Sequence, residues 1–173
     1  MSNEPRHLRD WIVALYAALD EAEPQRAEAI RKLAGDEISR MALDKDRITL
    51  RFVDGALIVR RMRASTAQLK SPHGATDRHT VTALLRGYME ISEAISNDHI
   101  RLHGTADQVM AICAIIEILV DASTRIPALQ RLAEAFLATT DAGDIRGARK
   151  NRSNHRERIA QKENSLLRRH GLL

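Results

Sequence analysis

Alternating apolar and polar positions between residues 47 and 62 predict a β-hairpin. Large apolar side chains recur at every second position from Ile48 to Phe52, and Leu57 and Val59 repeat the pattern, which is typical of half-buried strands. The Asp-Gly pair at residues 54–55 favours a tight turn, because glycine adopts positive φ without strain and aspartate tolerates it. A sheet with one apolar face needs a covering layer of helices.

Helical periodicity supplies that layer. Apolar residues three and four apart predict helices at residues 8–20, 24–34, 91–95, 106–120 and 127–136, and another through Tyr88 that Thr80 or Thr82 caps. Short strands are predicted at residues 38–43, 75–79 and 99–103. Thr105 is the predicted N-cap of the 106–120 helix.

Two of these helices leave alternatives open. The 106–120 helix is apolar nearly all round, which predicts burial on more than one side, either as an ordinary core helix or as the wall of a ligand site. The amphipathic stripe of the 8–20 helix predicts packing on the body, with a detachable lid or a dimer helix as the alternative.

Composition sets the class of protein. The chain of 173 residues is long enough for one domain and an appendage, and its 44% apolar content is ordinary for a globular core. Its single cysteine, Cys113, lies inside an apolar helical run, so no intrachain disulfide forms and a reducing compartment is favoured. The sequence shows neither a signal peptide nor a membrane-spanning run, so we expect a cytoplasmic protein.

Charge is divided unevenly along the chain. Residues 145–173 contain nine Lys or Arg and two Glu, a net charge of +7, which leaves −3 for residues 1–144 of the total +4. We expect this tail to be either a solvated, mobile charged end or a site for an anionic membrane, a nucleic acid or a protein partner. Its basic residues are Arg146, Arg149, Lys150, Arg152, Arg156, Arg158, Lys162, Arg168 and Arg169.

Catalytic and metal-binding patterns are not found. His99 and His103 are four residues apart, which on a strand separates them by about 13 Å, too far to share one ion. No phosphate-binding, zinc-protease, nucleophile-elbow or dithiol motif occurs. Cys113, flanked by alanine and isoleucine, is typical of an inert core thiol. We therefore expect no metal, no cofactor and no enzyme; an enzyme acting on a lipid precursor would need a polar cluster inside a ligand cavity, and the sequence locates none.

Residues of about 38–137 resemble the sterol carrier protein 2-like family. The hairpin RITLRFVDGALIV is similar to the central hairpin of that family, and ATDRHTVTALLRGYMEISEAISNDHIRLHG is similar to its strand, short helices and further strand. TADQVMAICAIIEIL resembles its cavity-covering helix. The resemblance implies an α+β fold, with a mostly antiparallel sheet of about five strands covered on one face by helices that enclose an apolar cavity.

The same resemblance implies a function and its residues. Members bind or transfer sterols, isoprenoids or fatty-acyl lipids, and the implied cavity positions are Leu50, Phe52, Leu57, Val59, Leu84, Leu85, Tyr88, Ile112, Ile116, Leu119 and Phe136. The domain would span residues 37–140, between N-terminal helices at 1–36 and a basic, mobile or partly helical tail at 141–173. The alternative is an adaptor with a filled core, recruited through its tail to a protein, nucleic acid or anionic surface. Either function is compatible with a homodimer.

Overall fold

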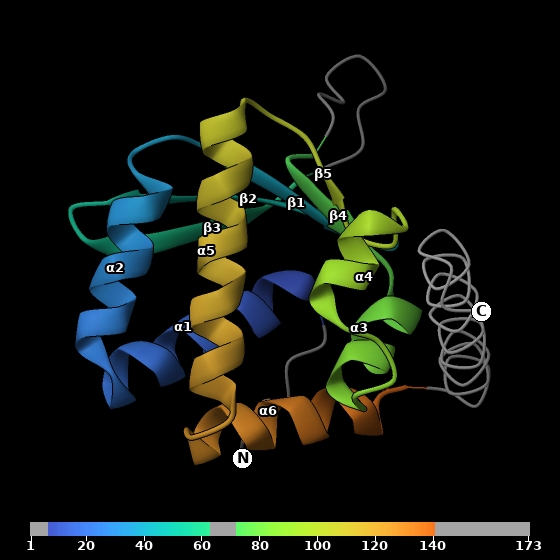
Figure 1. The fold of residues 1–173 in the computed structure, drawn as a ribbon. Helices are drawn as coiled ribbons and strands as arrows, with labels where there is room; N and C mark the ends of the chain where they lie inside the picture. Colours follow the sequence, from blue (N-terminus) through green and yellow to red (C-terminus); the bar gives the residue numbers. More distant parts are fainter. Residues whose placement is uncertain (1–6, 63–71, 141–173) are drawn as a thin grey trace, which may run out of the picture.

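The computed structural model describes residues 7–62 and 72–140, and the basic tail lies outside them. Within these ranges the chain forms six helices and five strands (Figure 1). In chain order they are α1 (Leu8–Ala22), α2 (Pro24–Ala34), β1 (Ser39–Leu43), β2 (Asp46–Val53), β3 (Ala56–Arg61), β4 (Gly74–Thr76), α3 (Arg78–Leu85), α4 (Ile91–Ser96), β5 (Arg101–Leu102), α5 (Ala106–Ser123) and α6 (Pro127–Ala138).

The strands form one open sheet in the order β3-β2-β1-β4-β5. The β1–β4 pair is parallel and the other three pairs are antiparallel. In Figure 1 α1, α3 and α6 lie below the sheet in the view, and α5 runs across it from above to below. The expected α+β fold with a mostly antiparallel sheet of five strands is therefore confirmed.

The β2–β3 hairpin forms as the alternation predicts. Leu50 pairs with Val59 and Phe52 with Leu57, so their side chains share one face, which packs against α1 and α6. Both turn residues have positive φ, 49° at Asp54 and 78° at Gly55, as a type I′ turn requires. A second tight turn, which the apolar pattern does not reveal, joins β1 to β2 and places Asp44 at a φ of 51°.

The start of α3 corrects the prediction for this segment. Strand β4 ends at Thr76, before the predicted end at residue 79, and Asp77 is the N-cap, with its carboxylate accepting from the backbone N–H of Thr80 at 2.7 Å. Thr80 and Thr82 are buried within the helix and do not cap it. Aspartate caps as well as threonine does, and it lies one residue before the first helical position. Thr105 does cap α5, within a capping box shared with Gln108.

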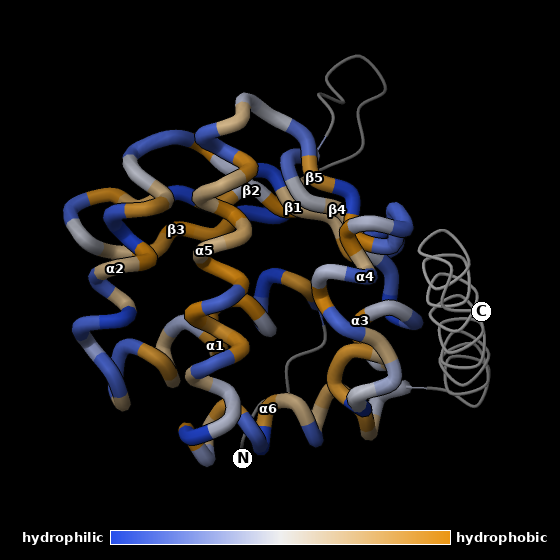
Figure 2. Tube along the Cα trace, viewed as in Figure 1, coloured by the Kyte–Doolittle hydropathy of each residue, from blue (hydrophilic) through white to orange (hydrophobic). Residues whose placement is uncertain are grey.

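Three clusters of buried side chains fill the space between the layers. The first joins α1, α2, α5 and α6 to Phe52 of the sheet, and the second joins α1 and α6 to β1–β3. The third is small and lies around Ala83, Met89 and Ala94 in the α3–α4 region. In Figure 2 hydrophobic colour runs along much of β3 and α5, two of the elements that contribute to these clusters. Within the described residues, no helix combines the length and apolar composition needed to cross a bilayer.

Candidate functional site

Eight of the eleven predicted cavity residues are divided among the three clusters, and the other three belong to none. Phe52, Leu57 and Leu119 belong to the first, and Leu50, Val59 and Phe136 to the second, where Leu57 also packs. Leu84 and Tyr88 belong to the third. Ile112 and Ile116 are half-buried and belong to none of the three, and Leu85 is 42% exposed. The sheet residues thus contact the N-terminal helices, while part of α5 keeps apolar surface that no cluster uses.

Helix α5 carries more apolar surface than its contacts bury. Of its 18 residues only Ala122 is fully buried, although the helix is apolar nearly all round. Its packed face meets α2 and α6 through Ile115, Ile118 and Leu119. Next to that face lies a second row at helical spacing, which we call the α5 flank. It consists of Val109, Ile112, Cys113, Ile116 and Val120, all half-buried or exposed.

The histidines and the cysteine of the described residues do not gather into a metal site. No three histidine, cysteine, aspartate or glutamate side chains converge as a metal site in residues 7–62 and 72–140. His99 precedes β5 and His103 follows it, because this strand is limited to Arg101 and Leu102 and is shorter than predicted. Cys113 is a free thiol of intermediate exposure on the α5 flank.

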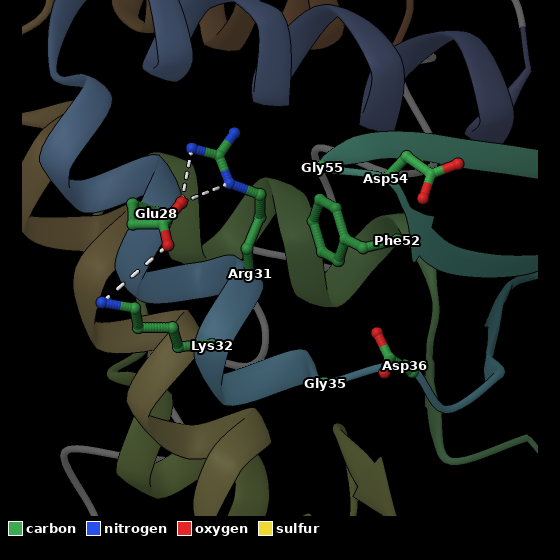
Figure 3. Close-up of a pocket in the computed structure, with 8 residues that line it drawn as sticks. All are labelled: Glu28, Arg31, Lys32, Gly35, Asp36, Phe52, Asp54 and Gly55. Carbon is green, nitrogen blue, oxygen red and sulfur yellow. Dashed lines mark hydrogen bonds and ion pairs between the residues drawn. The ribbon is translucent and has the colours of Figure 1, made fainter.

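A separate pocket of about 320 Å³ lies between α2 and the β2–β3 turn (Figure 3). It shares only Phe52 with the predicted cavity, and the rest of its lining is charged or glycine: Glu28, Arg31, Lys32, Gly35, Asp36, Asp54 and Gly55. Glu28 accepts from Arg31 Nε at 2.8 Å, and this hydrogen bond raises the pKa of the Arg31 guanidinium. Charged walls of this kind do not suit an apolar ligand.

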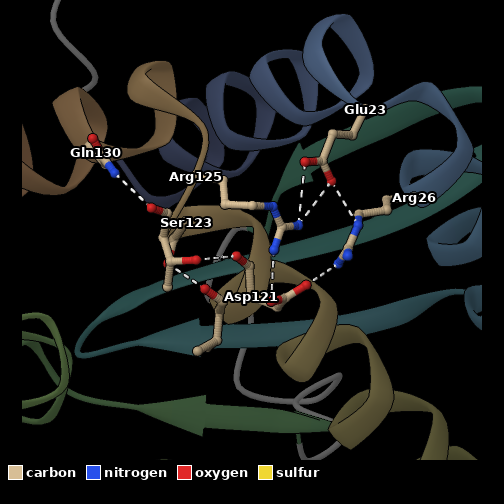
Figure 4. Close-up of polar contacts among 8 residues, drawn as sticks. Glu23, Arg26, Asp121, Ser123, Arg125 and Gln130 are labelled. Carbon is tan, nitrogen blue, oxygen red and sulfur yellow. Dashed lines mark hydrogen bonds and ion pairs between the residues drawn. The ribbon is translucent and has the colours of Figure 1, made fainter.

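Four charged side chains form a closed network where α5 ends (Figure 4). Arg125 donates to Asp121 at 2.8 Å and to Glu23 at 3.3 Å, and Arg26 pairs with the same two carboxylates at 2.5 and 2.7 Å. Hydrogen bonds from Arg125 and then Arg26 lower the pKa of the Asp121 carboxyl. Because Glu23 lies between α1 and α2, the network fixes the end of α5 against the N-terminal helices.

Replacement of Asp121 by asparagine is expected to lower the stability slightly at pH 7 and to change its acid dependence. A lowered carboxyl pKa favours the folded state above the unfolded value near pH 4, and this contribution is lost as the pH falls through the lower, folded value. The variant should therefore lose less stability than the wild type between pH 4 and pH 2. Urea unfolding midpoints across this range measure the difference.

Glu117→Gln is the matched control, because Glu117 is exposed one turn away on the same helix and has no ion pair within the described residues. For this variant, the urea unfolding midpoint at pH 7 and its decrease between pH 4 and pH 2 should both stay close to those of the wild type. Equal effects from the two variants would show that the network is only a set of solvated charges, as many surface ion pairs are.

Comparisons with protein-family models, with curated proteins and with solved structures find no match to the chain. The resemblance to the sterol carrier protein 2-like family therefore stays a prediction. What is known of the site comes from the geometry above, and its clearest feature is the apolar α5 flank.

Proposed function

We propose that this protein binds a hydrophobic ligand, of the sterol, isoprenoid or fatty-acyl class, against the α5 flank. The observation that supports the proposal is an apolar helix of 18 residues with one fully buried residue, in a fold that otherwise fills its three clusters. Leu85 adds exposed apolar surface on α3, which in Figure 1 is drawn on the other side of α5 from α2.

The energetics favour such a ligand without any sharp polar motif. Each CH₂ group that leaves water contributes about 0.8 kcal/mol, so a long acyl chain or a fused ring system binds by burial alone. In turn, the ligand would remove from water the isoleucine, valine and cysteine side chains of the α5 flank. Ligand binding would thus explain why the α5 flank is apolar although the protein's own core does not bury it.

The proposed activity is binding and transfer, without a chemical step and without a cofactor, in the cytoplasm. Polar groups that lie near α5, such as the Asp121 network, are paired with one another at its C-terminal end. The charged pocket beside α2 is a different surface. We assign neither of them a role toward the hydrophobic ligand.

The double variant Ile112→Gln/Ile116→Gln is expected to take up cis-parinaric acid or dehydroergosterol at least tenfold more weakly than the wild type. Each substitution replaces apolar contact area with an amide that must stay hydrated. Fluorescence titration measures the affinity, and native mass spectrometry of protein purified from its own host shows whether a molecule of defined mass is bound. Met110→Gln is the control, because Met110 is 70% exposed and lies outside the α5 flank.

A second variant covers the case in which the double variant unfolds. Ile116→Trp keeps the site apolar but fills space, so it should lower the amount of ligand bound while thermal unfolding stays near that of the wild type. If the folded wild type takes up neither probe and carries no bound molecule, the core is filled and the proposal is wrong. The adaptor function would then be the one to pursue, with deletion of residues 145–173 as its test.

A further inference from the structure

The face of the sheet that points away from the helices is strongly basic. Side chains alternate along each strand, so the residues next to the buried positions Ile48 and Phe52 in the sequence point outward. The outward positions of β1, β2 and β3 carry no aspartate or glutamate. They include four arginines: Arg40, Arg47, Arg51 and Arg60.

The pairing register gathers these arginines around one residue. Thr49 on the central strand β2 pairs with Arg60 on one side and with Arg40 on the other, and Arg47 and Arg51 lie two positions before and after it. From ideal strand geometry the group covers about 10 Å across the strands and about 13 Å along them. We call this group the arginine face. Its positive charges are spread over a flat area of the sheet and do not follow a single strand.

The row of paired positions that contains Arg60, Thr49 and Arg40 continues across the rest of the sheet. His73, which precedes β4, donates its backbone N–H to Arg40 at 2.8 Å, and its ring Nε2 lies 2.6 Å from Arg40 Nη2. Burial and then the Arg40 charge lower the pKa of the His73 imidazole, against a weaker opposing effect of Glu37. The backbone N–H of His103 donates to the carbonyl of His73, and Arg101 pairs with Ala75 in the next row.

Three of the four arginines of the arginine face lack the ion pairs that arginines make on the helical side, within the residues that the structure describes. Arg47, Arg51 and Arg60 form no ion pair or side-chain hydrogen bond within residues 7–62 and 72–140, and neither does Arg101. By contrast Arg61, the next residue after Arg60 but on the opposite face, pairs with Asp46 at 3.4 Å. Uncompensated like charges at diagonal positions of a sheet do not stabilise the fold. Their arrangement therefore points to a partner that brings the negative charge.

Aliphatic side chains adjoin the arginine face and indicate which partner fits. Ile58 pairs with Arg51 and is half-buried, and Ile38, just before β1, is 49% exposed. No aromatic side chain points outward from β1, β2 or β3 to stack on a base. A bilayer surface accepts both features, because acidic headgroups attract arginine and the boundary beneath them admits aliphatic groups.

We propose that the arginine face is a docking surface for membranes that contain acidic phospholipids. The sheet would lie on the headgroups and the helices would point away from the bilayer. The proposal stands apart from ligand uptake, because vesicle binding does not require a bound ligand. Its strength should fall with salt, since exposed charges are screened.

Flotation of the full chain with vesicles tests this proposal. The wild type is expected to bind phosphatidylcholine vesicles containing phosphatidylserine and not those of phosphatidylcholine alone. The triple variant R47Q/R51Q/R60Q should partition about a hundredfold more weakly at low salt, because each arginine near an acidic surface contributes about fivefold. It should fold normally, since these three side chains hold no ion pair within the described ranges.

The control R9Q/R86Q/R131Q removes the same charge from exposed, unpaired arginines of the described helical layer, and it keeps the basic tail. It should bind vesicles nearly as the wild type does. Equal losses in the two triple variants, or normal binding by R47Q/R51Q/R60Q, would overturn the proposal and assign any binding to net charge or to the tail. Single-stranded or duplex DNA bound through the same three arginines, with no vesicle binding, would overturn it in favour of nucleic acid. The single variant R51E, at an exposed position, should also weaken vesicle binding, because it replaces a positive charge with a negative one.

Discussion

Replacement of Phe52 by alanine is expected to lower the free energy of unfolding by about 3–5 kcal/mol. Phe52 is 7% exposed on the inner face of β2 and belongs to the largest buried cluster. Its ring centroid lies 5.2 Å from that of Tyr16 on α1, an additional aromatic contact that alanine removes. The substitution also leaves a cavity next to the charged pocket, where Phe52 is the aromatic part of the lining.

Denaturant unfolding monitored by circular dichroism measures this loss. Val53→Ala is the control, because Val53 is the next residue of the same strand, points to the outer face and is only half-buried. We expect it to cost less than about 1 kcal/mol, as surface substitutions do. Similar losses at the two positions would contradict the assignment of the sheet faces, and with it the outward direction of the arginine face.

Local signals explain why the hairpin and the cap of α5 were predictable. The Asp-Gly turn, the alternation of β2 and the threonine of the capping box all act between residues close in the chain. The periodicity of α5 likewise identified Ile112 and Ile116 as apolar. Periodicity does not show which neighbour an apolar side chain contacts. The division of the predicted cavity residues among three clusters therefore could not be predicted.

Features that depend on distant residues could not be predicted. The parallel pairing of β4 with β1 follows a connection at residues 62–73 that has no apolar pattern. The network around Asp121 joins Glu23 to Arg125, which are 102 positions apart. The arginine face is hidden in the same way, because its four arginines gather only when the register of three strands is known.

The second large effect is expected from Leu19→Ala, which should cost about 2–5 kcal/mol. Leu19 is fully buried in α1, in the cluster that also holds Ala27, Ile126 and Leu129 from α2 and the α5–α6 region. The other end of α1 is bound to the sheet, because the backbone N–H of Leu8 donates to the Asp46 carboxylate at 3.2 Å. Both ends of the helix are thus held by the body of the protein.

The same variant separates the two interpretations of α1. If α1 is part of the cooperative core, the variant unfolds in one transition at a lower denaturant concentration, and amide exchange accelerates in the sheet as well as in α1. A detachable lid would instead give faster exchange in α1 alone and an unchanged midpoint for the body. Val13→Ala, at a position of α1 that is 42% exposed, serves as the control and should alter neither. Because Leu19 and Phe52 share one cluster, we expect the cooperative result, in which α1 covers the sheet permanently and the α5 flank is the apolar surface left for a ligand.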